Sequence, residues 1–459
     1  MNPPDTLFAP PRVHVVRRAD GSLLLSNPTP LAQHVRRVGD WLEHWASTAP
    51  QRTFLQERDA SGAWHSVIYA QAREQVYAIA TWLLEHGAGT QGAQQAVMVL
   101  SENSVEHGLL ALACMHAGVP VAAVSPAFSL MSRDHAKLKS LTQLLRPSVI
   151  YCSDAATYGA ALAAVAPLHD AVVVAKRSAM ASMIGSEALY TRVNTPAVQA
   201  AFARVTPESI ARLLFTSGST GEPKGVINTH HMLTSNQAAR LQNWPFLQQI
   251  PPVVVDWLPW SHTFGANHNF NMVLANGGTM IVDSGKPMPG AFEATVRNLR
   301  EIAPTVYFNV PRGYDMLIAA LRADELLRKN FFSRVQLLFY AAAALPQTAW
   351  EALERLSMET LGRVVPMVSA WGSTETAPLA VDCHFQAPRS GVIGLPVPGV
   401  EVKLVPSGDK QEIRVRGQNV MPGYWQRPDL TEQAFDEEGF YKIGDAVRFA
   451  DPQQPELGL

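Results

Sequence analysis

The chain has 459 residues, of which 47% are hydrophobic and 17% charged, so we expect a globular enzyme with two or more lobes. The formal net charge of −2 excludes a global basic field that would draw nucleic acid or an anionic membrane. The three cysteines, Cys114, Cys152 and Cys383, form no CxxC pair, which argues against a disulfide framework or a zinc site and favours a reducing, cytoplasmic compartment.

The N-terminal segment MNPPDTLFAPPRVHVVRRADG has no apolar core of signal-peptide length. A second segment, residues 109–128, is apolar enough to raise the question of a membrane span. Gly118 and Pro120 interrupt it near the middle. It therefore predicts a buried helix followed by a buried strand, and we expect no membrane span.

Apolar runs of strand length alternate with helical patterns along most of the chain. The runs fall at residues 96–100, 148–152, 171–175, 212–216, 253–258, 305–310 and 335–340. Between the later runs, GAFEATVRNLREIA and PQTAWEALERLS have helical spacing. Strands that alternate with helices predict an α/β protein with parallel sheets covered on both faces.

The pattern changes after about Gly391. GVEVKLV, QEIRVRG and FYKIGDAVRFAD are short alternating segments separated by turn residues, which predicts a β-rich subdomain at residues 391–459 behind an α/β body at residues 1–390. RPDLTEQAFDEEGF, which lies between the last two, is interpreted as a charged surface turn. No helical pattern follows the last strand before the final DPQQPELGL, so we expect that the chain is cut at a domain boundary.

A phosphate-binding loop is predicted in LLFTSGSTGEPKGV, residues 213–226. A predicted strand ends at Phe215. It is followed by residues with hydroxyl groups, by glycines and by one lysine: Thr216, Ser217, Gly218, Ser219, Thr220, Gly221 and Lys224. Hydroxyl and backbone N–H donors beside a lysine suit an anion. Only two residues separate Gly218 from Gly221, so the spacing is not that of a P-loop NTPase. No GxSxG elbow is present, which excludes the usual serine hydrolase.

The string TSGSTGEPKG resembles the signature loop of the acyl-adenylate-forming superfamily, which includes acyl- and aryl-CoA synthetases, luciferases and the adenylation domains of peptide synthetases. The resemblance covers most of the chain, and further motifs follow in the family's order: DWLPWSHTFG (256–265), YAAAALP (340–346), SAWGSTETAP (369–378), EIRVRGQNVMPGYW (412–425) and GFYKIGD (439–445). It implies two stacked αβα subdomains with a small distorted β-barrel subdomain. It also implies that the family's small C-terminal domain, which carries a catalytic lysine, is absent from this chain.

The resemblance implies the chemistry as well. A carboxylate attacks the α-phosphate of ATP, pyrophosphate leaves, and the acyl group then passes to coenzyme A. The loop from Thr216 to Lys224 would hold the β- and γ-phosphates, with Lys224 offsetting their charge. Thr374 would donate to the α-phosphate, and Glu375 would ligate Mg²⁺, which bridges phosphate oxygens.

On the nucleoside side, the resemblance implies that Asp445 accepts hydrogen bonds from both ribose hydroxyls. Trp371, beside Gly372 of the same motif, would stack on adenine, although the family usually has a tyrosine there. Ala343 belongs to an alanine run that lies where the family has an adenine-side strand, and that would let a flat ligand lie against the backbone. His262 would lie beside the acyl carboxylate and the thiol tunnel.

Each of these assignments has a structural alternative. In isolation Glu375 could be a surface carboxylate and Asp445 a turn residue, but their motifs favour the functional interpretation. His262 could be a buried structural histidine. His230 and His231 lie in no pattern of metal ligands and are interpreted as opening the helix after the loop.

The substrate is predicted from residues 262–289, VPRGYDML and YAAAALP, which resemble the feruloyl or hydroxycinnamate branch more than the long-chain fatty acyl branch. The predicted function is an AMP-forming acid–CoA ligase of the feruloyl-CoA synthase type, of phenylpropanoid degradation, with ATP, Mg²⁺ and coenzyme A. The alternatives are a medium- or branched-chain acyl-CoA synthetase and a nucleotide-binding scaffold without a reaction. Without the lysine domain, this chain is expected to bind its substrates but to turn over poorly.

Overall fold

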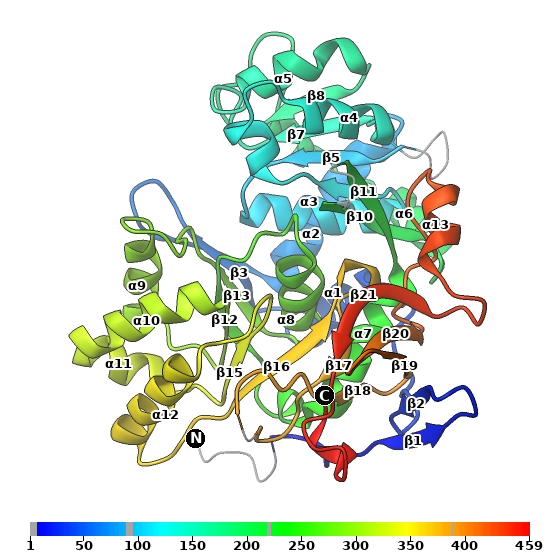
Figure 1. The fold of residues 1–459 in the computed structure, drawn as a ribbon. Helices are drawn as coiled ribbons and strands as arrows, with labels where there is room; N and C mark the ends of the chain where they lie inside the picture. The colour runs from blue at the N-terminus through cyan, green and yellow to red at the C-terminus, as the bar shows by residue number, and fades with distance from the viewer. Residues whose placement is uncertain (1–6, 89–94, 218–221, 388) are drawn as a thin grey trace.

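The computed structural model describes residues 7–88, 95–217, 222–387 and 389–459. Figure 1 shows an α/β lobe at the top, a second α/β lobe at the lower left, and a strand-rich part at the lower right. The upper lobe is built on a seven-stranded sheet in which every neighbouring pair is parallel except β10 and β11. In spatial order its strands are β11 (Pro223–Thr229), β10 (Ile210–Ser217), β6 (Val121–Ala123), β5 (Val97–Leu100), β7 (Val149–Cys152), β8 (Val172–Ala175) and β9 (Ile184–Gly185).

The central strands of this sheet are apolar on both faces. On β5, Val97 and Val99 pack into the main core beside α2 (Tyr69–Glu85) and α3 (Val105–Ala117). Met98 and Leu100 pack on the opposite face against α4 (Ala136–Leu145) and α5 (Gly159–Val165). Helices on both faces explain why the sequence shows continuous apolar runs rather than alternation.

The lower lobe contains two further sheets. One has the strand order β12 (Val253–Asp256), β13 (Thr279–Val282), β3 (Thr53–Arg58) and β4 (Trp64–Ile68). The other has the order β14 (Val306–Asn309), β15 (Leu337–Tyr340), β16 (Met367–Gly372), β17 (Leu379–Asp382) and β18 (Leu395–Pro396). The outer helices of this lobe are α9 (Phe292–Glu301), α10 (Pro311–Ala323), α11 (Glu325–Phe332) and α12 (Gln347–Leu361).

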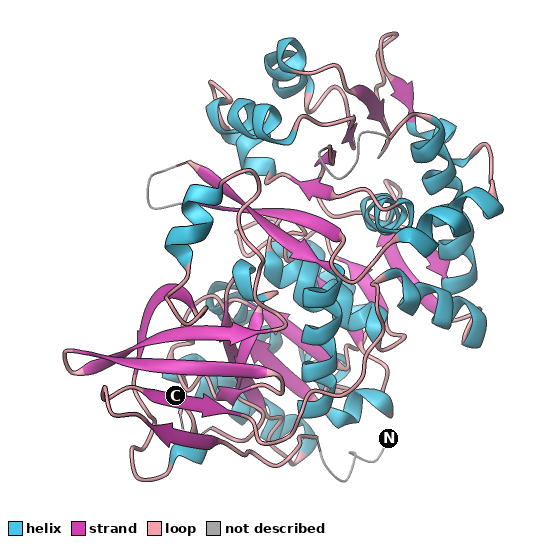
Figure 2. Ribbon diagram, turned by 90° about the vertical axis from the view of Figure 1, so that its right-hand side faces the viewer, coloured by secondary structure: helices cyan, strands magenta, loops and turns pink. Residues whose placement is uncertain are grey.

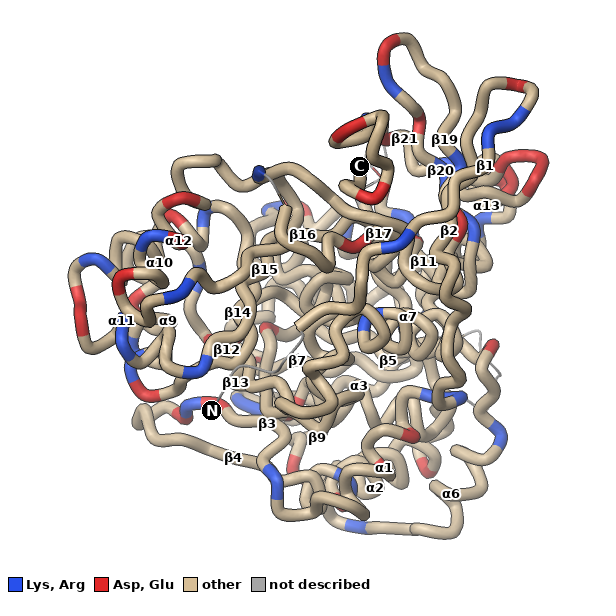
Figure 3. Tube along the Cα trace, turned by 90° about the horizontal axis from the view of Figure 1, so that it is seen from below, with Lys and Arg blue, Asp and Glu red and all other residues tan. Residues whose placement is uncertain are grey.

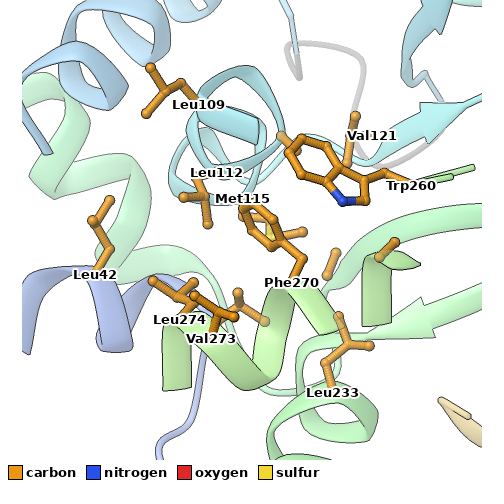
Figure 4. Close-up of a cluster of buried hydrophobic side chains, with 14 of the residues drawn as sticks. Leu42, Leu109, Leu112, Met115, Val121, Leu233, Trp260, Phe270, Val273 and Leu274 are labelled. Carbon is orange, nitrogen blue, oxygen red and sulfur yellow. The ribbon is translucent and has the colours of Figure 1, made fainter. Parts of the chain in front are cut away.

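The main core joins the two lobes. Val306 and Phe308 of β14 face it, whereas Tyr307 between them faces the core under α10 and α11. Figure 4 shows part of the main core, where side chains from several elements meet: Leu109, Leu112, Met115, Phe270, Val273 and Leu274. Charged residues of both signs lie mostly on the outer helices and on hairpin turns (Figure 3).

The strand-rich part is a five-stranded sheet in the order β1 (His14–Arg17), β2 (Leu23–Ser26), β19 (Val400–Ser407), β20 (Lys410–Gly417) and β21 (Tyr441–Val447). All its pairs are antiparallel, and the long strands stand out in Figure 2. The N-terminal hairpin β1–β2, which the sequence did not predict as part of it, joins residues 391–459 through β19. Leu25 and Val402 pack together in its core.

The remaining helices are α1 (Gly39–Thr48), α6 (Thr195–Arg204), α7 (His230–Asn243), α8 (Asn271–Ala275) and α13 (Pro428–Ala434). Two sequence predictions are confirmed here: residues 109–128 contain the end of helix α3, which begins at Val105, and then strand β6, and α7 begins at His230. One was wrong: residues 428–434, interpreted from the sequence as a surface turn, form a short helix with Pro428 at its first position, where proline is well tolerated. The alanine run 341–344 follows β15 as a loop, with Ala342 at φ 72°.

Across the described part of the chain, none of the helices combines the length and apolarity that a membrane crossing needs.

Candidate functional site

A cavity of about 1170 Å³ opens where the two lobes and the strand-rich part meet. Every predicted site residue whose side chain the structure describes lines this cavity: Thr216, Lys224, His262, Ala343, Trp371, Gly372, Thr374, Glu375 and Asp445. Gly218, Ser219, Thr220 and Gly221, together with the Ser217 side chain, lie outside the described residues. The structure thus brings together residues that are spread over more than half of the chain.

The hairpin of β10 and β11 fixes the two described ends of the predicted phosphate loop. Thr216 and Lys224 are direct partners in its antiparallel register, so a hydroxyl and an ammonium lie side by side at the cavity. The Lys224 ammonium lies 5.2 Å from the centre of the Tyr424 ring. An anion that enters from this side meets a donor and a positive charge together.

Glu375 lies in a 3₁₀ turn (Thr374–Thr376) one residue after the end of β16 and is only 6% exposed. Its Oε1 accepts a hydrogen bond from the Tyr424 hydroxyl at 3.0 Å. Burial, and secondly the negative charge of Glu375, raise the pKa of both Tyr424 and Tyr441. Both phenols therefore stay protonated and can donate. The carboxylate is held in place at the cavity wall by a neutral partner, and no ion pair to it occurs among the described residues.

Two strands from different sheets meet at the cavity. Trp371 is the last residue of β16 before the register of that strand shifts at Gly372. Its indole Nε1 donates to Asp445 Oδ2 on β21 at 2.9 Å. The sequence predicted both residues as nucleotide contacts but gave no sign that they bond each other. Ser373, which the sequence analysis missed, also lines the cavity, and its buried hydroxyl has no partner among the described residues.

The inner end of the cavity has an aromatic wall. Phe264 and His268, from a π-helical turn over Phe264–Phe270, contact Phe339 of β15 with ring centroids 5.7 and 5.1 Å apart. The segment before this turn is held by Asn103, whose amide donates to the Leu258 carbonyl at 2.8 Å. The ring of His262 is open to the cavity, yet the surrounding protein removes enough water to lower its pKa.

A buried polar network supports this wall from behind. Arg240 on α7 donates to Asp382 Oδ1 at 2.6 Å and to His268 Nε2 at 2.8 Å. Since Nε2 accepts, Nδ1 of His268 carries the proton and donates to Asn269 Oδ1 at 2.8 Å. Burial, and secondly Arg240, lower the pKa of His268 to about 3, so the ring is neutral.

The same network reaches Asp256 at the end of β12. Asn269 donates to its Oδ2 at 3.0 Å, and burial raises the pKa of Asp256 to about 7. The sequence analysis missed this network. A usable signal was present, because Asp256 and Asp382 each end an apolar strand where a charge is unexpected.

The chain resembles known proteins over most of its length. A family model described as AMP-binding enzyme matches residues 42–425. The long-chain-fatty-acid–CoA ligase of Escherichia coli O6:H1 is 31% identical over 262 residues, covering 52% of this chain and 44% of the relative. The mitochondrial malonate–CoA ligase of Homo sapiens is 26% identical over 281 residues, covering 53% and 47%. The chain spans about half the length of the curated relatives it matches.

Solved structures show the same fold. ATP-bound MatB from Rhodopseudomonas palustris superposes with a TM-score of 0.67 at 23% identity, covering 90% of this chain and 77% of MatB. A malonyl-CoA ligase with methylmalonyl-CoA and AMP bound superposes with a TM-score of 0.65 at 27% identity, covering 88% and 77%. The predicted fold class is confirmed. These relatives are named for fatty acids and malonate, whereas the sequence analysis predicted ferulate.

Proposed function

Since the chain belongs to the family of AMP-binding enzymes, we propose that it is the nucleotide- and acid-binding body of an acid–CoA ligase. The reaction would join a carboxylic acid to ATP as an acyl adenylate and then pass the acyl group to coenzyme A. The observation that carries this proposal is that one cavity combines a cation at Lys224, a buried carboxylate at Glu375 and an aromatic wall.

The first half-reaction brings two anions together. A carboxylate oxygen of the acid forms a bond to the α-phosphorus, the bond from that phosphorus to the bridging oxygen breaks, and pyrophosphate leaves with the electron pair. Lys224 and the Thr216 hydroxyl would offset charge on the leaving phosphates. Thr374 would donate to the α-phosphate, and His262 would stand beside the acid. Such fixed donors and charges lower the barrier because they need no reorganisation during the reaction.

The family's Mg²⁺ fits the residues present. Mg²⁺ in nucleotide sites is usually held by one or two carboxylates together with substrate phosphates and water. Glu375 offers one such carboxylate at the cavity wall. Among the described residues, no group of three or more His, Cys, Asp and Glu side chains is arranged so that it could hold a metal ion, so the ion would be bound mainly by the phosphates. When bound, it would neutralise phosphate charge.

Asp445 is proposed to bind the ribose, and replacing it with alanine is expected to weaken ATP and AMP binding alike. Hydrogen bonds to a charged group are worth about 1.5–3 kcal/mol, so the dissociation constants should rise roughly 10- to 150-fold. Calorimetric titration of both nucleotides measures this. Pyrophosphate, which has no ribose, should bind as before, and an equal loss for pyrophosphate would contradict the assignment.

We further propose an aromatic acid, with ferulate or another hydroxycinnamate as the first candidate. Three features support it: the ring wall of Phe264, His268 and Phe339; the small residues of the loop 341–344; and the neutral state of His268. A planar ring can lie against such a wall with favourable edge and face contacts.

Malonate is less suited to this cavity, because its second carboxylate needs a cation. Among the described lining residues, lysines are found at two positions, Lys224 and Lys442, and no arginine. Lys224 lies over Tyr424, and Lys442 is on β21 close to Asp445. Both therefore belong to the nucleotide side. A medium- or branched-chain fatty acid stays the alternative, since it needs no cation and the E. coli relative is named for fatty acids.

The deciding experiment supplies the protein with ATP, Mg²⁺ and one acid at a time: ferulate, coumarate, benzoate, octanoate or malonate. Mass spectrometry then measures acyl-AMP, with the Asp445→Ala variant as the matched control. We expect the hydroxycinnamates to give the most acyl-AMP. Octanoate ahead of every aromatic acid would overturn the aromatic assignment. ATP binding without any acyl-AMP would favour a nucleotide-binding scaffold.

A further inference from the structure

A second, much smaller cavity lies outside the nucleotide site, between α3, β6 and β10. Its volume is about 20 Å³, enough for one occupant of about the size of a water molecule. One charged side chain, Arg212, borders it, together with His107, Trp260 and apolar residues. Figure 4 shows Trp260 beside Val121 and above Phe270, all three of which border this cavity.

Arg212 has a position that arginine rarely occupies. It is 5% exposed and lies on the same face of β10 as Leu214 and Thr216, since alternate residues of a strand share a face. No hydrogen bond or ion pair to its guanidinium occurs within the described residues, and its Nε is buried without a partner.

The charge on this side chain persists. Burial lowers the pKa of Arg212 to about 10, which still leaves the guanidinium protonated at neutral pH. An isolated buried charge is strongly unfavourable unless it is paired. Other buried basic side chains of this protein are paired: Arg240 with Asp382 at 2.6 Å and Lys403 with Asp436 at 3.1 Å.

The acidic side chains on the neighbouring elements are engaged elsewhere. Glu106 on α3 accepts from the Tyr151 hydroxyl at 2.8 Å and lies 3.7 Å from Lys176. Glu57 on β3 accepts from the backbone N–H of Val105 at 2.8 Å. Neither forms an ion pair with Arg212.

His107 supplies no negative charge either. Its Nδ1 contacts the Glu102 carbonyl at 3.3 Å, so Nδ1 carries the proton. Burial first, and the nearby positive charge of Arg212 in addition, lower the pKa of His107 to about 4. The cavity is therefore bordered by the positively charged Arg212 guanidinium and otherwise by neutral, mostly apolar side chains.

We propose that this cavity is a binding site for one monatomic anion, of the charge and approximate size of chloride, held by the Arg212 guanidinium. The ion would provide the missing counter-charge beneath the strand that carries Thr216 to the nucleotide cavity. A water molecule would fit the same space but would leave the charge uncompensated, so it is the competing occupant that the test must distinguish.

The first test is crystallographic and needs no catalytic activity. Crystals of the protein grown with sodium bromide in place of chloride are measured at the bromine absorption edge. We expect an anomalous peak in contact with the Arg212 guanidinium. Density in the cavity without an anomalous peak would mean water, and an empty cavity would equally overturn the proposal.

The second test uses thermal unfolding in sodium chloride against sodium gluconate at equal ionic strength. Chloride should raise the Tm of the wild type by roughly 2 °C or more, because a ligand that binds only the folded state stabilises it. Arg212→Met should lose this dependence, and Arg212→Lys, which keeps the charge, should retain part of it. Arg36→Met, at an exposed arginine, should behave as the wild type.

If Arg212→Met does not fold, the bromide crystals and the Arg212→Lys titration still decide the question. Equal chloride dependence in the wild type, Arg212→Met and Arg36→Met would show that the effect comes from the surface, and the assignment to this cavity would fail.

Discussion

Replacing Glu375 with glutamine is expected to slow acyl-adenylate formation by about 100-fold or more, the usual cost of losing one preorganised group at a reacting phosphate or oxyanion. The change keeps the size of the side chain and leaves an Oε1 that can still accept from Tyr424. It removes the negative charge that would hold Mg²⁺. The rate should therefore fall while the fold persists, and higher Mg²⁺ concentrations should recover part of it.

The matched control is Tyr424→Phe, which removes the hydroxyl that donates to Glu375 at 3.0 Å and leaves the carboxylate. We expect a smaller loss, of about 10-fold or less, because one neutral hydrogen-bond donor to the charge is lost rather than the charge itself. Steady-state rates at several Mg²⁺ concentrations compare the two. A Glu375→Gln variant with unchanged rate and unchanged Mg²⁺ dependence would rule out a metal role for Glu375.

Replacing Asp382 with alanine is expected to lower the free energy of unfolding by about 3–5 kcal/mol, since it leaves a buried cation without its partner. Arg240 and Asp382 are 1% and 0% exposed at their side chains. Asp382 also accepts from Asn243 at 3.0 Å through its second oxygen. The variant thus loses two hydrogen bonds and gains an unpaired charge. Urea unfolding, followed by circular dichroism, measures the change.

The double variant Arg240→Met, Asp382→Leu separates the cost of the unpaired charge from the cost of the lost hydrogen bonds. It removes both charges, so its loss of stability should be clearly smaller than that of Asp382→Ala, as found when buried ion pairs are replaced as a unit. If the double variant is the less stable of the two, the unpaired charge is not the main cost. Because Arg240 also bonds His268, the double variant should in addition alter the aromatic wall and lower the rate with aromatic acids.

The sequence determined those parts of the protein that depend on residues close together in the chain. The runs at 96–100 and 148–152 became β5 and β7 because a strand buried on both faces must be apolar throughout. The motif TSGSTGEPKG was sufficient to predict the family, since its glycines, hydroxyls and lysine lie within ten residues. The N-terminus of α7 at His230 was likewise predictable from local pattern.

Tertiary structure alone decided which of these residues meet. Trp371 bonds Asp445 across 74 residues, and Arg240 bonds Asp382 across 142. The hairpin β1–β2 joins β19 from the far end of the chain. Such contacts are set by how whole sheets pack, and a strand's local periodicity reports only that one face is buried, not which residue lies opposite. The partner of Asp445 and the lone charge of Arg212 could therefore be recognised only once the chain was folded.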